Sequence, residues 1–155
     1  MLTTAQHKKG FTLIELLVVI GILAVLLAIV LIAINPARQF SQANDTKRAS
    51  DVNAVLNAIH QYSADNRGVI TTLNIGTTAT AISSTGVGAA FCNALVTEYM
   101  AALPQDPELN AGAPIQEADC DGTWDTGYVA SQSATDSRIT ISAPNADQGP
   151  IQIIR

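Results

Sequence analysis

The sequence is poor in the residues from which most active sites are built. It has two histidines, His7 and His60, and neither has an acid or a nucleophile at a fixed spacing. We interpret His60 as a polar histidine on a helix surface. No glycine-rich phosphate loop, nucleophile motif or internal repeat occurs in the chain. We therefore predict a protein that is not an enzyme and needs no cofactor.

Basic residues are also scarce. The chain has 8 Lys and Arg residues against 13 Asp and Glu residues, a formal net charge of −5. Because an acidic surface repels phosphate backbones, strong general binding of nucleic acid is not expected. Lys47 and Arg48 form a local basic pair, which we interpret as part of a solvated helix face.

Hydrophobic residues make up 48% of the chain and are concentrated at one end. Every residue from Leu16 to Ile34 is uncharged, and as a helix this stretch spans about 28 Å, close to the hydrocarbon core of a bilayer. No other stretch approaches this length, so one membrane span is predicted. An ordinary secretory signal is cut after its apolar region, but here Met1–Gly10 is polar and the apolar region follows it. Lys8 and Lys9 favour a cytoplasmic start and export of the rest.

The spacing of apolar residues predicts that the helix continues beyond the span. Asn35-Pro36 ends or kinks the first segment, because proline lacks a backbone N–H and clashes with the preceding turn. Apolar residues then recur at mostly three- and four-residue intervals, and polar residues fill the other face. Asn66-Arg67-Gly68 supplies a C-terminal stop. We predict one long helix over residues 11–66, disturbed near Pro36. Its later apolar positions are Phe40, Ala43, Val52, Val55, Leu56, Ile59 and Tyr62.

The rest of the chain predicts a small head, which makes the fold class α+β. A helix is expected over residues 89–102, ended by Pro104, and short strands over residues 128–130, 138–142 and 151–154. These elements give an antiparallel sheet of about three strands packed with the long helix. Residues 69–88 are interpreted as a surface connection with room for a short strand, and residues 105–125 as a loop. The predicted parts are a leader (1–10), a membrane helix (11–34), its amphipathic continuation (35–68) and an exported head (69–155).

Two cysteines, Cys92 and Cys120, lie in the predicted exported head. A metal site would want four ligands, whereas two spaced cysteines in a small exported domain favour a disulfide. Closing that loop would stabilise the head by roughly 3–4 kcal/mol if the gain is entropic. The alternative is a pair of unrelated buried thiols.

The most specific signal is the string Lys8-Lys9-Gly10-Phe11-Thr12-Leu13-Ile14-Glu15, which continues as Leu-Leu-Val-Val-Ile. It combines basic residues, a glycine, an aromatic residue and an acid inside an apolar run. The string resembles the junction of type IV prepilins and type II secretion pseudopilins, and the close resemblance covers residues 8–34.

This resemblance implies a course of processing and assembly. Prepilin peptidase, a membrane-embedded aspartyl peptidase, would cut between Gly10 and Phe11, and the new amine of Phe11 would be N-methylated. Glu15 matches the family's acid at the fifth mature position, which pairs with the N-terminal amine of a neighbouring subunit. A carboxylate in an apolar span costs roughly a few kcal/mol unless it is paired. The alternative is that Glu15 simply lies at the level of the lipid headgroups.

The same resemblance favours a structural subunit of a type IV pilus, serving adhesion, motility or DNA uptake. Its implied partners are further copies in a helical filament, prepilin peptidase and the pilus assembly machinery of the inner membrane. The protein would lie in the cytoplasmic membrane before assembly and in an extracellular pilus afterwards. The Cys92/Cys120 pair resembles the disulfide-closed C-terminal region of many pilins.

Two alternatives remain open. The string Leu103-Pro104-Gln105-Asp106-Pro107 resembles the Leu-Pro-x-Asp-Pro string of many major pseudopilins, and it favours a pseudopilin of a type II secretion system. From a different class, the chain would be a membrane-tethered binding module that does not polymerise.

Calcium is the one metal that this resemblance raises, since the heads of such pseudopilins can bind it. The candidate ligands are Asp106, Asp119, Asp121 and Asp125. The segment from Asp119 to Gly122 fits an EF-hand loop poorly, because Tyr128 stands where the bidentate glutamate belongs. We therefore favour a solvated acidic loop and predict no metal site.

Overall fold

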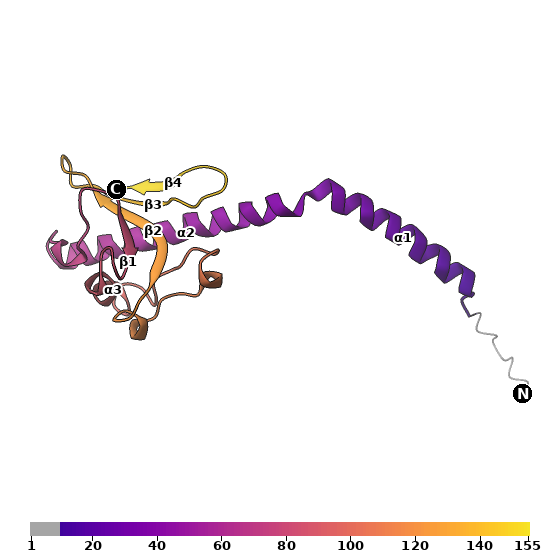
Figure 1. The fold of residues 1–155 in the computed structure, drawn as a ribbon, viewed down its shortest axis with the longest axis horizontal. Helices are drawn as coiled ribbons and strands as arrows, with labels where there is room; N and C mark the ends of the chain where they lie inside the picture. The colour runs from indigo at the N-terminus through magenta and orange to yellow at the C-terminus, as the bar shows by residue number, and fades with distance from the viewer. Residues whose placement is uncertain (1–9) are drawn as a thin grey trace, which may run out of the picture. The chain divides into compact units, whose positions relative to one another are not determined.

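The computed structural model describes residues 10–155 (Figure 1). The chain divides into two compact units, Met1–Gln39 and Phe40–Arg155, and we call the second the head unit. The predicted leader lies outside the described residues except for Gly10. The head unit begins within the predicted amphipathic helix, because the residues that follow Phe40 share a core with the strands.

The first unit is formed mainly by helix α1, Leu13–Ile34. Thr12 caps its N-terminus, and Asn35 ends it in a left-handed conformation with φ 44°. Helix α2, Pro36–Asp65, then begins directly at the proline. Because proline has no N–H to donate and asparagine tolerates positive φ, the break falls at this dipeptide, where a disturbance was predicted.

Within the head unit, α2 carries the buried stripe that the periodicity predicted from Val52 onward, whereas Phe40 and Ala43, the first two positions of the predicted stripe, are exposed. Val52, Val55, Leu56 and Ile59 are fully buried, and Tyr62 is nearly so. They form one core with residues of the strands and of helix α3, Ala89–Leu95. The stripe also contains Arg48, which is fully buried. The prediction of a solvated Lys47-Arg48 face is therefore wrong for Arg48.

The sheet has four antiparallel strands in the order β1-β2-β3-β4. The three predicted strands are present as β2 (Asp125–Gln132), β3 (Ile139–Ala143) and β4 (Ile151–Ile154). The fourth, β1 (Thr80–Ser83), lies in the stretch read as a connection with room for a strand. Its pairing with β2 buries Ile82 and places Ala81 opposite Val129.

Helix α3 is shorter than predicted, since it ends at Leu95 rather than at residue 102. Val96 is already extended, and Thr97 has φ 74°, a conformation that a helix cannot continue through. The Leu95 carbonyl accepts hydrogen bonds from both Tyr99 and Met100, which turn the chain back. The apolar spacing beyond Leu95 therefore reflects a packed turn rather than another helical turn.

A disulfide joins Cys92 of α3 to Cys120, with 5.4 Å between their Cα atoms. Both cysteines are fully buried. The bond ties α3 to the end of the acidic loop that precedes β2, so it closes a loop of the head across 28 residues.

Candidate processing and assembly site

The junction ahead of α1 is open on all sides among the described residues. Gly10 has no atom within 4 Å of where a side-chain Cβ would stand. Phe11 is 85% exposed. A backbone in this state is accessible to an enzyme that must grip the chain at this point. The basic residues Lys8 and Lys9, like His7, lie outside the described residues.

Glu15 folds back on the start of its own helix. Its Oε2 atom accepts hydrogen bonds from the Thr12 backbone N–H and the Thr12 hydroxyl, each at 2.8 Å. The Thr12 hydroxyl oxygen in turn accepts from the Glu15 N–H at 3.3 Å. This reciprocal arrangement is a capping box, which satisfies backbone donors that a helix start leaves without partners. Within the part of the chain that the structure describes, the other oxygen, Oε1, accepts no hydrogen bond.

Helix α1 has no buried face. It has 22 residues, and all of its large apolar side chains are about half exposed or more. Its length of about 33 Å and its mean hydropathy of 3.5 suit a membrane span. An apolar surface of this extent needs lipid or other helices around it, because water solvates it poorly.

Residues 6–31 match a family model described as the prokaryotic N-terminal methylation motif. The match covers the Gly10–Phe11 junction, Glu15 and most of α1. The chain carries the hallmark of type IV pilins and pseudopilins. No curated protein and no solved structure matches it.

The motif settles a coarse description of the protein and leaves the finer one open. It implies processing by prepilin peptidase and assembly into pilus-type filaments. Together with α1 it fits anchoring in a membrane before assembly. The motif is common to pili and secretion pseudopili, so it does not separate them. It also lies outside the head unit.

The head unit contains a buried charge cluster centred on Arg48. The guanidinium binds Asp106 through two atoms, Nε to Oδ2 at 2.9 Å and Nη2 to Oδ1 at 3.0 Å. It also contacts Asp45 at 2.9 Å, Glu108 at 3.1 Å and Asp147 at 3.4 Å. One arginine therefore holds α2, the loop after Pro104 and the β3–β4 loop together.

The pKa values in this cluster follow from the pairing. The hydrogen bond to Asp106 raises the pKa of Arg48 above its already high ordinary value. Burial alone would raise the pKa of the Asp106 carboxyl, but hydrogen bonds from Arg48 and the Glu108 N–H outweigh burial and lower it. Both groups are therefore charged at neutral pH.

This cluster accounts for the Leu-Pro-Gln-Asp-Pro string. Asp106 is fully buried on Arg48, and its N–H donates to the Thr126 carbonyl at 2.8 Å. The Gln105 carbonyl accepts from Lys47 Nζ at 2.8 Å. Gly127 has φ 78°, and a Cβ there would stand 2.9 Å from Asp106 Cβ. The string therefore serves here to seat an arginine of α2.

The calcium candidates are not brought together. Asp106 is committed to Arg48, whereas Asp119, Asp121 and Asp125 are exposed. Asp121 accepts from Asn93 at 3.0 Å, and Asp125 from the Gly127 N–H at 2.9 Å. Among residues 10–155 no group of three or more His, Cys, Asp or Glu side chains is placed to hold a metal ion.

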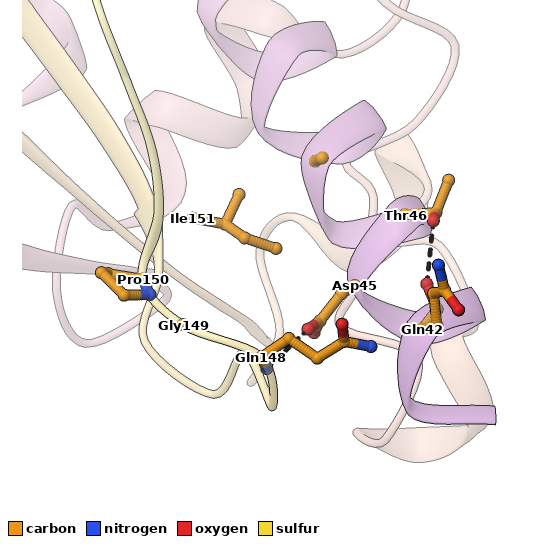
Figure 2. A pocket seen from close by; sticks show the side chains of 8 residues that line it. Gln42, Asp45, Thr46, Gln148, Gly149, Pro150 and Ile151 are labelled. Atoms are coloured by element: carbon orange, nitrogen blue, oxygen red, sulfur yellow. Dashed lines mark hydrogen bonds between the residues drawn. The ribbon is translucent and has the colours of Figure 1, made fainter. Parts of the chain in front are cut away.

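A groove of about 600 Å³ lies beside the cluster, between α2 and the β3–β4 loop (Figure 2). Asp45 lines the groove and accepts hydrogen bonds from the backbone N–H groups of Asp147, at 3.1 Å, and Gln148, at 2.8 Å. Burial would raise the pKa of Asp45, but these amides and Arg48 lower it overall. Figure 2 shows the helix side and the loop side of the groove facing each other. The lining residues are Gln42, Asp45, Thr46, Ala49, Gln148, Gly149, Pro150 and Ile151.

Sequence reasoning placed Gly10, Phe11 and Glu15 at one end of a helix, and they lie there. It missed the Arg48 cluster and the groove. One signal was available: Arg48, Val52, Val55 and Ile59 follow each other at four, three and four residues, so Arg48 is in register with the buried stripe. The sequence contains no such signal for the acids that bind Arg48, because Asp106 and Asp147 lie 58 and 99 residues away from it.

Proposed function

We propose that this protein is a structural subunit that polymerises through α1 into a type IV pilus serving adhesion, motility or DNA uptake. One observation carries the proposal: a prokaryotic N-terminal methylation motif leads into an apolar helix with no buried face. Before assembly the chain lies in the cytoplasmic membrane with its N-terminus in the cytoplasm. After assembly by the inner-membrane pilus machinery it lies outside the cell.

Maturation removes the leader by cleavage between Gly10 and Phe11, and the Phe11 amine is then methylated. The open backbone at Gly10 and the exposed Phe11 side chain support this role. A bulky residue in place of Gly10 would obstruct the close approach that the peptidase needs, so uncut precursor should accumulate in the membrane. Mass spectrometry of assembled protein tests the cut, since a retained leader would contradict it.

Glu15 joins neighbouring subunits. Cleavage creates a positive amine at Phe11, four residues before Glu15, and the carboxylate keeps one oxygen without a hydrogen bond among the described residues. Pairing with the amine of a neighbouring copy would offset the cost of burying both charges. Such pairing would also set the axial offset between subunits.

The filament core would be a bundle of α1 helices. Once outside the lipid, α1 would expose its apolar side chains to water unless copies of itself surround it. Each Å² of apolar surface that the bundle keeps from water contributes roughly 25 cal/mol. One segment thus serves first as the membrane anchor and then as the core.

A type II secretion pseudopilus is the second candidate. The Leu103–Pro107 string, which resembles that of major pseudopilins, favours it. Purifying surface filaments and sequencing their subunit separates the two, because a pseudopilin at normal levels would be missing from long surface filaments. A tethered binding module that never polymerises would tolerate Glu15→Lys.

The deciding experiment uses three variants at the helix start. Glu15→Ala should insert in the membrane and be cut, yet yield few filaments, because an amine is left unpaired. Glu15→Gln keeps a carbonyl oxygen for Thr12 and loses only the charge, so it should fail similarly. Thr12→Ala removes the hydroxyl from the capping box and keeps the acid, so it should assemble near normally.

The two controls separate capping from pairing. If Glu15 acted only as a helix cap, Thr12→Ala would reduce filament yield and Glu15→Gln would not. Normal filaments made of Glu15→Ala subunits alone would refute the pairing mechanism. The measurements are the mass of sheared filaments and the amount of mature subunit left in the membrane.

A further inference from the structure

The groove beside Arg48 has an acidic rim with carboxylate oxygens that can bind a further cation. Four carboxylates surround the single Arg48 guanidinium, and the two that are substantially exposed are those of Glu108 and Asp147. Asp147 is the rim acid next to the groove, and its side chain is 39% exposed. Only its Oδ2 atom contacts Arg48, at 3.4 Å, and Oδ1 accepts no hydrogen bond within residues 10–155. This rim attracts a cation.

The walls of the groove are partly apolar. Ala49 of α2 lines the groove together with the loop residues Gly149 and Pro150 and the first residue of β4, Ile151. The occupant that suits such a site combines one positive charge with a neighbouring apolar side chain.

The described chain has few cations to offer. Lys47 pairs with Asp51, Arg48 is buried and Arg138 pairs with Asp136. Arg155 donates to Asn57. Among the Lys and Arg residues that the structure describes, only Arg38 and Arg67 have side chains without an ion pair or a hydrogen bond.

Arg67 lies on an exposed tip at the end of α2, which we define as residues 66–69. Arg67 itself and Gly68 both have positive φ, 55° and 84°, so the chain turns sharply here. Val69 follows and is 56% exposed. The tip therefore carries one free cation beside one exposed apolar side chain, which is the combination that the groove requires.

We propose that the tip of one copy of this chain docks in the groove of the next copy. The groove and the tip lie on one compact head unit, at opposite ends of its part of α2. About 20 residues of helix separate them, roughly 30 Å. A copy cannot fill its own groove across this distance, so the contact joins different copies.

The docking joins two different patches, so the same contact can repeat from one copy to the next. When the copies are related by translation along an axis, the repeated contact builds an open filament rather than a closed ring. The docking therefore adds a head-to-tail bond along a filament, in which successive docked heads are displaced by roughly 30 Å. This inference rests on the proposed filament and adds to it a specific contact between heads. Arg67 would bind Asp147, and Val69 would lie against Pro150 and Ile151.

Charge reversal tests the pair. Arg67→Glu and Asp147→Lys should each lower the yield of sheared filaments about tenfold, the effect of losing roughly 1.4 kcal/mol per contact. The double variant restores attraction with the charges exchanged and should recover the yield. Arg38→Glu is the matched control, since Arg38 is the other unpaired cation among the described residues. If Asp147→Lys restored the filament yield of Arg38→Glu but not that of Arg67→Glu, the assignment of the pair would be wrong.

Crosslinking supplies a second, direct readout. Oxidised filaments of a Val69→Cys/Gln148→Cys chain should yield a ladder of covalent multimers, because the native cysteines are already bonded and buried. A Val69→Cys/Thr135→Cys chain should stay monomeric, since Thr135 lies in the turn at the other end of β3. If wild-type filaments form but neither ladder nor charge rescue occurs, the docking is wrong and the filament stands. If no filament forms at all, the proposed function fails first.

Discussion

Replacing Arg48 with methionine should destabilise the head more than any surface substitution. The change keeps most of the side-chain volume and removes the charge that faces the fully buried Asp106. The Asp106 carboxylate would keep only the 2.9 Å hydrogen bond from the Glu108 N–H. Breaking a buried ion pair from one side costs about 3–5 kcal/mol. Since the free energy of unfolding of a small domain is about 5–15 kcal/mol, the substitution would remove a large part of it.

The assay is urea unfolding of the mature protein in detergent, followed by fluorescence. Trp124 is the only tryptophan, lies in the head and is 6% exposed, so its emission reports on the head alone. Its indole N–H donates to the Cys120 carbonyl at 2.9 Å, which fixes its environment in the folded state. For a domain of this size the same loss would lower Tm by roughly 10–20 °C.

Two comparison variants make the result specific. Asp147→Asn removes a half-exposed partner at 3.4 Å and should cost less than about 1 kcal/mol. Arg48→Met/Asp106→Leu exchanges the pair for apolar side chains and should recover most of the loss. The reasoning is refuted if Arg48→Met unfolds within about 1 kcal/mol of the wild type, or if the double variant is less stable than the single one.

Three further results are expected. Because the folded pKa of Asp106 lies below its unfolded value, its contribution is complete above about pH 4 and is lost as pH falls through the folded pKa, so urea midpoints should drop on acidification. A pH-independent midpoint between pH 5 and pH 2 would contradict this. Gly127→Ala should destabilise the head, since φ is 78° and the new Cβ would stand 2.7 Å from Leu109 Cδ1; an unchanged Tm would show that the backbone relaxes freely. Cys92→Ser/Cys120→Ser should cost roughly 3–4 kcal/mol in the same urea assay, and labelling of both native thiols by alkylation without reductant would show that no bond forms.

The first part of the molecule could be predicted from sequence because its signals are local. The proposed cut site, the proposed first mature residue and Glu15 lie within six consecutive residues, 10–15. The number of residues in the uncharged run can be read directly from the sequence. Multiplied by the rise per residue of a helix, it gives a length that matches the hydrocarbon core of a bilayer. The break at Asn35-Pro36 follows from the chemistry of two adjacent residues.

The head could be predicted only in part. Alternation was enough for β3 and β4, whose inward residues are mostly isoleucines, whereas only residues 128–130 of β2 were predicted. It was too weak for β1, a four-residue strand that depends on pairing with β2 some 45 residues further on. Helix α3 stops early because Thr97 takes a positive φ within a packed turn, which the apolar spacing does not reveal.

Sequence by itself determined the N-terminal methylation motif, the apolar helix and the buried stripe of α2 from Val52 onward, since each depends on neighbours within a few positions. Tertiary structure alone decided that Arg48 is buried, that Asp106 is a structural ion-pair partner, and that a groove opens beside Asp45. The physical reason is that a charge enters a protein core only when its counter-charge is already fixed there. For Arg48 that counter-charge comes from loops 58 and 99 residues away, which only the folded chain brings together.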